Sequence, residues 1–306
     1  MPAPNSHADR LANLPTEQRN ASSMDLDLLS SEQILRLMNC QDKLVPVAVE
    51  KQIPQIVRAV DMIVEALKNG GRLLYAGAGT SGRLGVVDAS ECPPTFGTDP
   101  EQVKGIIAGG RDAVFRSQEG AEDDAAAGRR DIDREHTGPR DVVCGIAASS
   151  VTPYVVAAVA RGRELGAKTI FIATNPAGEL VAWVDVAICP EVGPEVLMGS
   201  TRLKSGSAQK LVLNMLTTAA MVKLGKVYEN MMVDLHLSSV KLQERGKRIV
   251  ALATGANEER AVAVLKEAGG HVKTAIVMIA GNLSAAEAGK KLEAAGGFVR
   301  QALQTR

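Results

Sequence analysis

Short apolar runs alternate with longer helical patterns through the middle of the chain. The runs typical of buried strands are Leu73–Ala76, Val103–Ala108, Asp141–Ala147, Thr169–Ala173 and Val184–Cys189. Helical patterns follow several of them, notably Tyr154–Leu165 and the segment from Lys204 to about Leu224. This alternation predicts an α/β fold, a parallel sheet covered by helices on both sides. In such sheets, ligands bind beyond the carboxyl ends of the strands.

Helical segments flank this region on both sides. Ser31 precedes a first apolar helical pattern, and a long helix is expected from about Val45 to Lys68, ended by Gly70 and Gly71. Residues 1 to about 20 lack periodicity and are expected to be mobile. Three short helices are expected at Asn257–Ala268, His271–Ile279 and Ser284–Ala295, with His271 as a polar residue at a helix start. The predicted organisation is N-terminal helices at 1–60, a catalytic α/β domain at 61–245 and a C-terminal helical module at 246–306.

A glycine-rich turn follows the first predicted strand. Gly77, Gly79 and Gly82 fit the pattern G-x-G-x-x-G, and Thr80 and Ser81 lie inside it. A turn of this kind brings backbone N–H groups and hydroxyls close to an anion at the start of the next helix. The same pattern also occurs in dinucleotide-binding turns, but no acidic residue clearly ends the following strand, as that site requires. A purely structural glycine turn is the third interpretation.

Two later loops repeat the hydroxyl-rich chemistry. One carries Ser149, Ser150 and Thr152 before a predicted helix, and the other carries Ser200, Thr201 and Lys204. Ser and Thr also cap helices, so each loop alone has a structural interpretation. Three such loops in one α/β unit favour a phosphate site. The candidate phosphate-binding residues are therefore Gly79, Thr80, Ser81, Gly82, Ser149, Ser150, Thr152, Ser200, Thr201 and Lys204.

Composition excludes several classes of function. Lys plus Arg equals Asp plus Glu at 35 each and aromatic residues are 3%, which disfavours nucleic acids and anionic membranes as partners. The four cysteines are far apart, so the sequence predicts neither a disulfide framework nor a metal site, and most are expected to be buried. No secretory signal and no apolar segment long enough for a bilayer are recognised, so a cytoplasmic location is expected.

Several longer strings carry a family resemblance from about residue 12 to the end. They are TEQRN (16–20), GAGTSGRLGVVDASECPPTFG (77–97), IAGG (107–110), EGAED (119–123), GIAAS (145–149), KSGSAQKLVLNMLTT (204–218), GKVYENMMVD (225–234), KTAIVM (273–278) and GGFVRQAL (296–303). On these motifs the chain resembles the N-acetylmuramic acid 6-phosphate etherases, which have the sugar isomerase (SIS) fold. The resemblance implies a homodimer with sites near the subunit interface and a C-terminal module of ubiquitin-associated type. Val151 departs from it, since the family commonly has arginine there.

The resemblance also implies a reaction and its residues. The family splits the lactyl ether at C3 of a phosphorylated amino sugar, giving N-acetylglucosamine 6-phosphate and D-lactate. Glu122 matches the base that takes the C2 proton, and Glu91 matches the acid that protonates the departing lactate. Neither a metal nor another cofactor is expected, since one base and one acid suffice. The neighbouring Glu119, Asp123 and Asp124 are expected to be surface charges or helix-start carboxylates.

Three alternatives compete with this hypothesis. An aldose–ketose isomerase would use the same phosphate loops and a base at C2, but it needs no acid for a leaving group at C3. A non-catalytic sugar-phosphate regulator would resemble the glucokinase regulators, which contain two SIS units, whereas 306 residues leave room for one. A dinucleotide-dependent enzyme is the third alternative.

Overall fold

The structure, a computed structural model, describes residues 14–176, 178–237 and 239–304. Part of the start that the sequence predicts to be mobile, residues 1–13, lies outside these ranges. The chain divides into two compact units. The first contains the chain up to Ser90 together with Glu101–Thr217, and the second contains Glu91–Pro100 and everything from Thr218 on.

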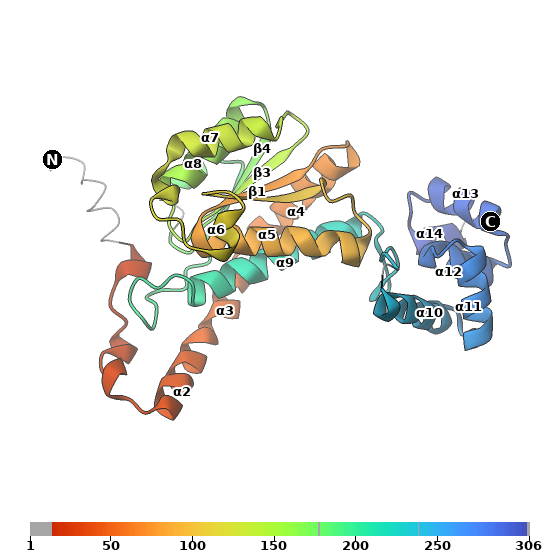
Figure 1. Cartoon of the computed structure of the whole chain (residues 1–306), viewed down its shortest axis with the longest axis horizontal. Helices are drawn as coiled ribbons and strands as arrows, with labels where there is room; N and C mark the ends of the chain where they lie inside the picture. Colours follow the sequence, from red (N-terminus) through yellow and green to blue (C-terminus); the bar gives the residue numbers. More distant parts are fainter. Residues whose placement is uncertain (1–13, 177, 238, 305–306) are drawn as a thin grey trace. The chain divides into compact units, whose positions relative to one another are not determined.

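The first unit is built on a parallel sheet of five strands in the order β2-β1-β3-β4-β5 (Figure 1). The strands are β1 (Leu73–Gly77), β2 (Val103–Ile107), β3 (Val142–Ile146), β4 (Lys168–Ile172) and β5 (Val186–Ile188). Each lies where an apolar run predicts it, and every residue of β1 and β3 is buried. The predicted fold class is therefore confirmed.

Helices cover both faces of this sheet (Figure 1). On one face α7 (Ala125–Arg134) packs on α8 (Pro153–Glu164), whose Val155 and Val159 share a buried cluster with Leu74 of β1. The opposite face carries α4 (Ile53–Lys68), α5 (Gly79–Phe96) and α9 (Lys204–Lys223). The alternation of side chains along a strand explains the two layers, because Leu74 and Tyr75 of β1 point to opposite faces.

The long helix expected before the first strand is interrupted. It consists of α3 (Leu44–Glu50) and α4, which begins at Ile53 with Pro54 in its first turn. Proline has no N–H group to continue a helix and is favoured in a first turn, so the prediction of one helix is wrong at this point.

Helix α2 (Ser31–Asp42) begins with a capping box between Ser30 and Gln33. The short turns of this unit are η1 (Pro15–Glu17), η2 (Ala21–Ser23), η3 (Leu26–Leu28), α6 (Asp112–Phe115), η4 (Ala121–Asp123) and η5 (Gly178–Ala182).

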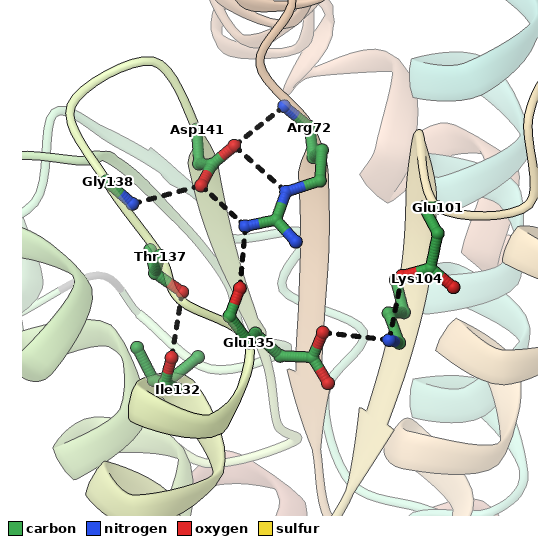
Figure 2. Close-up of polar contacts among 8 residues, drawn as sticks. All are labelled: Arg72, Glu101, Lys104, Ile132, Glu135, Thr137, Gly138 and Asp141. Carbon is green, nitrogen blue, oxygen red and sulfur yellow. Dashed lines mark hydrogen bonds and ion pairs between the residues drawn. The ribbon is translucent and has the colours of Figure 1, made fainter.

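A charged network fixes the amino ends of the strands (Figure 2). Asp141 accepts hydrogen bonds from the backbone N–H of Arg72 at 2.9 Å, from its Nε and Nη2 at 3.2 and 2.9 Å, and from the N–H of Gly138 at 3.0 Å. Arg72 Nη2 also donates to the carbonyl of Glu135 at 2.8 Å, and Lys104 pairs with Glu135 and Glu101. The residues immediately before β1 and β3 are thereby tied together at the amino end of the sheet, opposite the carboxyl ends.

We expect Asp141→Asn to destabilise the protein by about 2 kcal/mol at neutral pH, because charge-assisted hydrogen bonds are lost. Burial raises the pKa of Asp141, but the bonds from Arg72 and Gly138 outweigh it and hold the pKa below the ordinary 3.8. The ionised form is thus favoured by folding. Its contribution is complete above pH 3.8 and is lost as the pH falls through the lower folded value.

Urea unfolding followed by circular dichroism at pH 7, 5, 4 and 3 checks this expectation. The difference between the wild type and Asp141→Asn should be largest at pH 7 and 5 and should shrink below pH 4. Asp25→Asn, at an exposed position without a side-chain capping bond, is the matched control and should leave the midpoint unchanged. A wild-type advantage that is equal at pH 7 and 3 would contradict the role given to the Asp141 charge.

The second unit is helical apart from a small hairpin. Strands β6 (Val227–Tyr228) and β7 (Met231–Met232) pair antiparallel. The helices are α10 (Val240–Thr254), α11 (Glu258–Glu267), α12 (Val272–Gly281), α13 (Ala285–Ala294) and α14 (Val299–Gln304). Helix α12 packs against the other four, and its Val272, Ile276 and Met278 lie in the buried core of this unit. The three helices expected here are α11, α12 and α13, and His271 is the N-cap of α12, as predicted.

None of the helices in the described ranges is both long and apolar enough to cross a membrane.

Candidate active site

A cavity of about 400 Å³ opens at the carboxyl ends of β1 and β3. These strands are neighbours, but the chain leaves β1 toward β2 on one side and β3 toward β4 on the other. Loops diverge at such a switch point and leave a crevice, the usual ligand site of an open α/β sheet. The lining residues are Thr16, Glu17, Ala78, Gly79, Thr80, Ser81, Glu122, Asp123, Ile146, Ala147, Ala148, Ser149, Val151, Thr152, Pro153, Gly199 and Thr201.

The glycine-rich turn brings the start of α5 against the end of β1. Helix α5 begins at Gly79, whose φ of 52° is in the left-handed region that favours glycine. A Cβ atom on Gly82 would lie 2.7 Å from the carbonyl oxygen of Gly77 and 2.6 Å from Cγ1 of Ile107. Gly82 is therefore needed for close packing and does not line the cavity, whereas Gly79 does.

Two helix N-termini and four hydroxyls meet at the cavity. Thr80 and Ser81 belong to the first turn of α5, and Thr152 is the N-cap of α8, with Ser149 three residues before it. The hydroxyls of Ser149 and Thr152 lie 3.2 Å apart, and Ser81 Oγ donates to Gln209 Oε1 at 2.9 Å. Helix N-termini carry unpaired N–H groups and partial positive charge, so this wall is suited to a phosphate group.

Carboxylates form another part of the wall. Glu122 and Asp123 come from η4, which follows Gly120 with a φ of 73°. Glu17 comes from η1. No Lys, Arg or His occurs among the described residues that line this cavity. The arrangement thus places carboxylates, which can accept protons, beside the wall suited to a phosphate group.

The N-terminal segment is held at the cavity by Asn175, which follows β4. The N–H of Thr16 donates to Asn175 Oδ1 at 3.3 Å, and Asn175 Nδ2 donates to the carbonyl of Ala148 at 2.9 Å. Asn20 is also buried and donates to Gln41 Oε1 and to the carbonyl of Pro194. The expectation of a mobile start is therefore wrong from Leu14 onward, because long-range hydrogen bonds fix this segment.

Comparison with known proteins decides the family. The model of the glucokinase regulatory protein N-terminal SIS domain matches residues 55–162. N-acetylmuramic acid 6-phosphate etherase from Salinibacter ruber is 58% identical over 99% of this chain and 98% of its own length. Proteins of the same name from Vibrio cholerae (numbered 2) and Caldanaerobacter subterraneus are 52% and 53% identical, each over 96% of both chains. The chain belongs to the N-acetylmuramic acid 6-phosphate etherase family. The solved structure of a phosphoheptose isomerase from Francisella tularensis is 17% identical, with a TM-score of 0.47 over 63% of this chain and all of that one.

The two carboxylates that the resemblance to this etherase family singles out occupy different surroundings. Glu122 lines the cavity. Glu91 is exposed on α5, roughly three turns beyond Gly79, and is not among the described residues that line the cavity of its own chain.

The third hydroxyl-rich loop contributes only in part. Gly199 and Thr201 line the cavity, but Ser200 and Lys204 do not, and neither does Ser150 of the second loop. The buried Lys204 Nζ donates to the carbonyl of Val192 at 2.8 Å and to Gln41 Oε1 at 3.1 Å. Burial lowers the pKa of Lys204, while the charge of Glu195 opposes that shift. Lys204 therefore anchors the start of α9.

Glu195 was not singled out by sequence reasoning. Its carboxylate is fully buried and accepts the backbone N–H groups of Lys204 and Ser205 at 3.0 and 2.9 Å, so it caps α9. Of the residues that line the cavity, Thr16, Glu17 and Asp123 were also missed as site residues. The string TEQRN was the signal for the first two, since it was recognised as a family motif without a chemical role.

A buried carboxylate connects the elements behind the cavity. Asp88 of α5 accepts hydrogen bonds from Tyr75 Oη of β1 at 3.0 Å, and from Asn214 Nδ2 and Thr217 Oγ1 of α9 at 2.8 and 3.2 Å. Burial raises the pKa of Asp88, although the three hydrogen bonds favour the ionised form.

The predicted burial of most cysteines is confirmed for Cys92, Cys144 and Cys189. In the described parts of the chain, no three His, Cys, Asp or Glu side chains are grouped to hold a metal ion.

Proposed function

We propose that this protein cleaves the C3 lactyl ether of N-acetylmuramic acid 6-phosphate, giving N-acetylglucosamine 6-phosphate and D-lactate. The cavity at the switch point carries the proposal, because it combines a phosphate-binding wall with Glu122 in a chain of the etherase family. The proposal includes the cytoplasmic location expected from the sequence.

In the proposed mechanism the phosphate binds where the N-termini of α5 and α8 meet the hydroxyls of Thr80, Ser81, Ser149 and Thr152. The sugar reacts in its open-chain form, in which the C2 hydrogen is acidic because it is α to the C1 aldehyde. Glu122 removes this proton, the C3–O bond breaks, and a C2–C3 double bond forms. Water then adds its oxygen to C3 while a proton returns to C2, so no net oxidation occurs.

The departing lactyl oxygen needs a proton, which we assign to Glu91. Because Glu91 is exposed and does not line the cavity of its own chain, we infer that a second copy of the chain supplies it. An apolar surface suited to self-association is present on α2–α4, where Leu35, Leu44, Val47, Ile53 and Val57 are each at least 45% exposed. The active unit we propose is therefore a homodimer with shared sites.

Incubation of the purified protein with N-acetylmuramic acid 6-phosphate tests the function. We expect D-lactate and N-acetylglucosamine 6-phosphate in equal amounts, measured with a coupled D-lactate dehydrogenase assay and by mass spectrometry. Conversion of the sugar to a ketose without lactate release would instead identify an isomerase. Binding without conversion would identify a sugar-phosphate regulator.

A further inference from the structure

A second hollow of about 100 Å³ adjoins the cavity. The two share Ala78, Gly79 and Glu122 as lining residues, so a sugar bound in the cavity can project a substituent past Glu122 into the hollow. The proposed mechanism does not use this space.

One cation faces the hollow. Arg83 lies one turn into α5, and it is the only positively charged side chain among the described residues that line either the cavity or the hollow. Its Nε donates to the carbonyl of Val114 at 2.9 Å, which fixes the guanidinium in place. No acidic partner of Arg83 occurs within the described ranges, so its terminal nitrogens retain donors for a ligand.

The rest of the hollow is small and mixed in character, with the polar side chains of Ser117, Gln118 and Glu119 beside four alanines. Ala78, Ala108, Ala113 and Ala121 present methyl groups. Glu119 also lines it, and its Oε1 accepts a hydrogen bond from Ser117 Oγ at 3.1 Å. A single fixed cation with alanine methyl groups on part of the wall suits a short acid that carries one carboxylate and one methyl group.

We propose that this hollow is the subsite for the lactyl group and that Arg83 binds the lactyl carboxylate. The assignment rests on the proposed function, in which Glu122 removes the proton on C2. The ether oxygen is attached to the neighbouring carbon, C3. With C2 facing Glu122, the C3 substituent enters the adjoining space. Arg83 thereby selects sugars that carry the lactyl acid over the otherwise identical product.

Arg83→Gln tests this assignment through two ligands that differ only at C3. The variant should lower kcat/KM for N-acetylmuramic acid 6-phosphate by about 10- to 100-fold, the range expected for a hydrogen-bonded charge pair. The inhibition constant of N-acetylglucosamine 6-phosphate, which lacks the lactyl group, should change less than about twofold. Arg111→Gln removes the same charge from an exposed site outside both spaces and should change neither value.

The result that overturns the proposal is a loss of affinity for both sugars to the same degree, or for neither. Should Arg83→Gln fail to fold, the wild type still decides with a substrate analogue in which a carboxamide replaces the lactyl carboxylate. The proposal expects at least about tenfold lower kcat/KM for the amide, measured by formation of N-acetylglucosamine 6-phosphate; equal values overturn it. A wild type that cleaves neither compound would refute the proposed function instead.

Discussion

Glu122→Gln should lower the rate of D-lactate release by about 10³-fold or more, because the C2 proton then has no base. The variant keeps the shape of the side chain in the cavity wall, so substrate binding should change little. Exchange of the C2 proton with solvent should disappear together with lactate release, since both require the same proton transfer.

Proton NMR of the sugar in deuterium oxide and a lactate assay measure the two quantities on one sample. Glu65→Gln, on the exposed face of α4, is the control and should keep both rates. Lactate release by Glu122→Gln at the wild-type rate would remove Glu122 from the mechanism.

Glu91→Ala should also stop lactate release, but it should leave C2 exchange in place, because Glu91 acts on the leaving oxygen and not on the C2 proton. The two variants are therefore expected to be inactive for different reasons. A loss of exchange in Glu91→Ala as complete as in Glu122→Gln would contradict this division of roles.

Mixing the two inactive variants tests whether a second chain supplies Glu91. If the sites are shared, a heterodimer of Glu91→Ala and Glu122→Gln chains has one site with both carboxylates and one with neither. Equal amounts that exchange freely should then recover about a quarter of the wild-type activity, as expected for a two-fold assembly. No recovery after subunit exchange, checked by native mass spectrometry, would place both carboxylates within one chain.

The sheet could be predicted from the sequence because its signals are local. Strands buried on both faces are read as continuous apolar runs, and β1 and β3 appear where those runs lie. The interruption between α3 and α4 had a local signal too, since Pro54 lies inside the segment expected to be one helix. The apolar periodicity continues across this interruption, so the pattern predicted one helix despite the proline.

The grouping of the hydroxyls at one cavity was predictable for a similar reason. Thr80, Ser81, Ser149 and Thr152 follow predicted strands, and the carboxyl ends of neighbouring parallel strands lie at one edge of a sheet. The structural role of Lys204 was less predictable. Its partner Gln41 is 163 residues away in the sequence, and its other partner is the backbone carbonyl of Val192, which carries no sequence signal. The position of Glu17 likewise depends on contacts of Thr16 with Asn175, far away in the sequence.

The most direct measurement of the central claim is the isotopic content of the product formed by the wild type in deuterium oxide enriched in ¹⁸O. Elimination followed by addition of water predicts N-acetylglucosamine 6-phosphate with deuterium at C2 and ¹⁸O at C3, and D-lactate without ¹⁸O at its hydroxyl. A product with hydrogen retained at C2, or lactate carrying the labelled oxygen, would contradict the account.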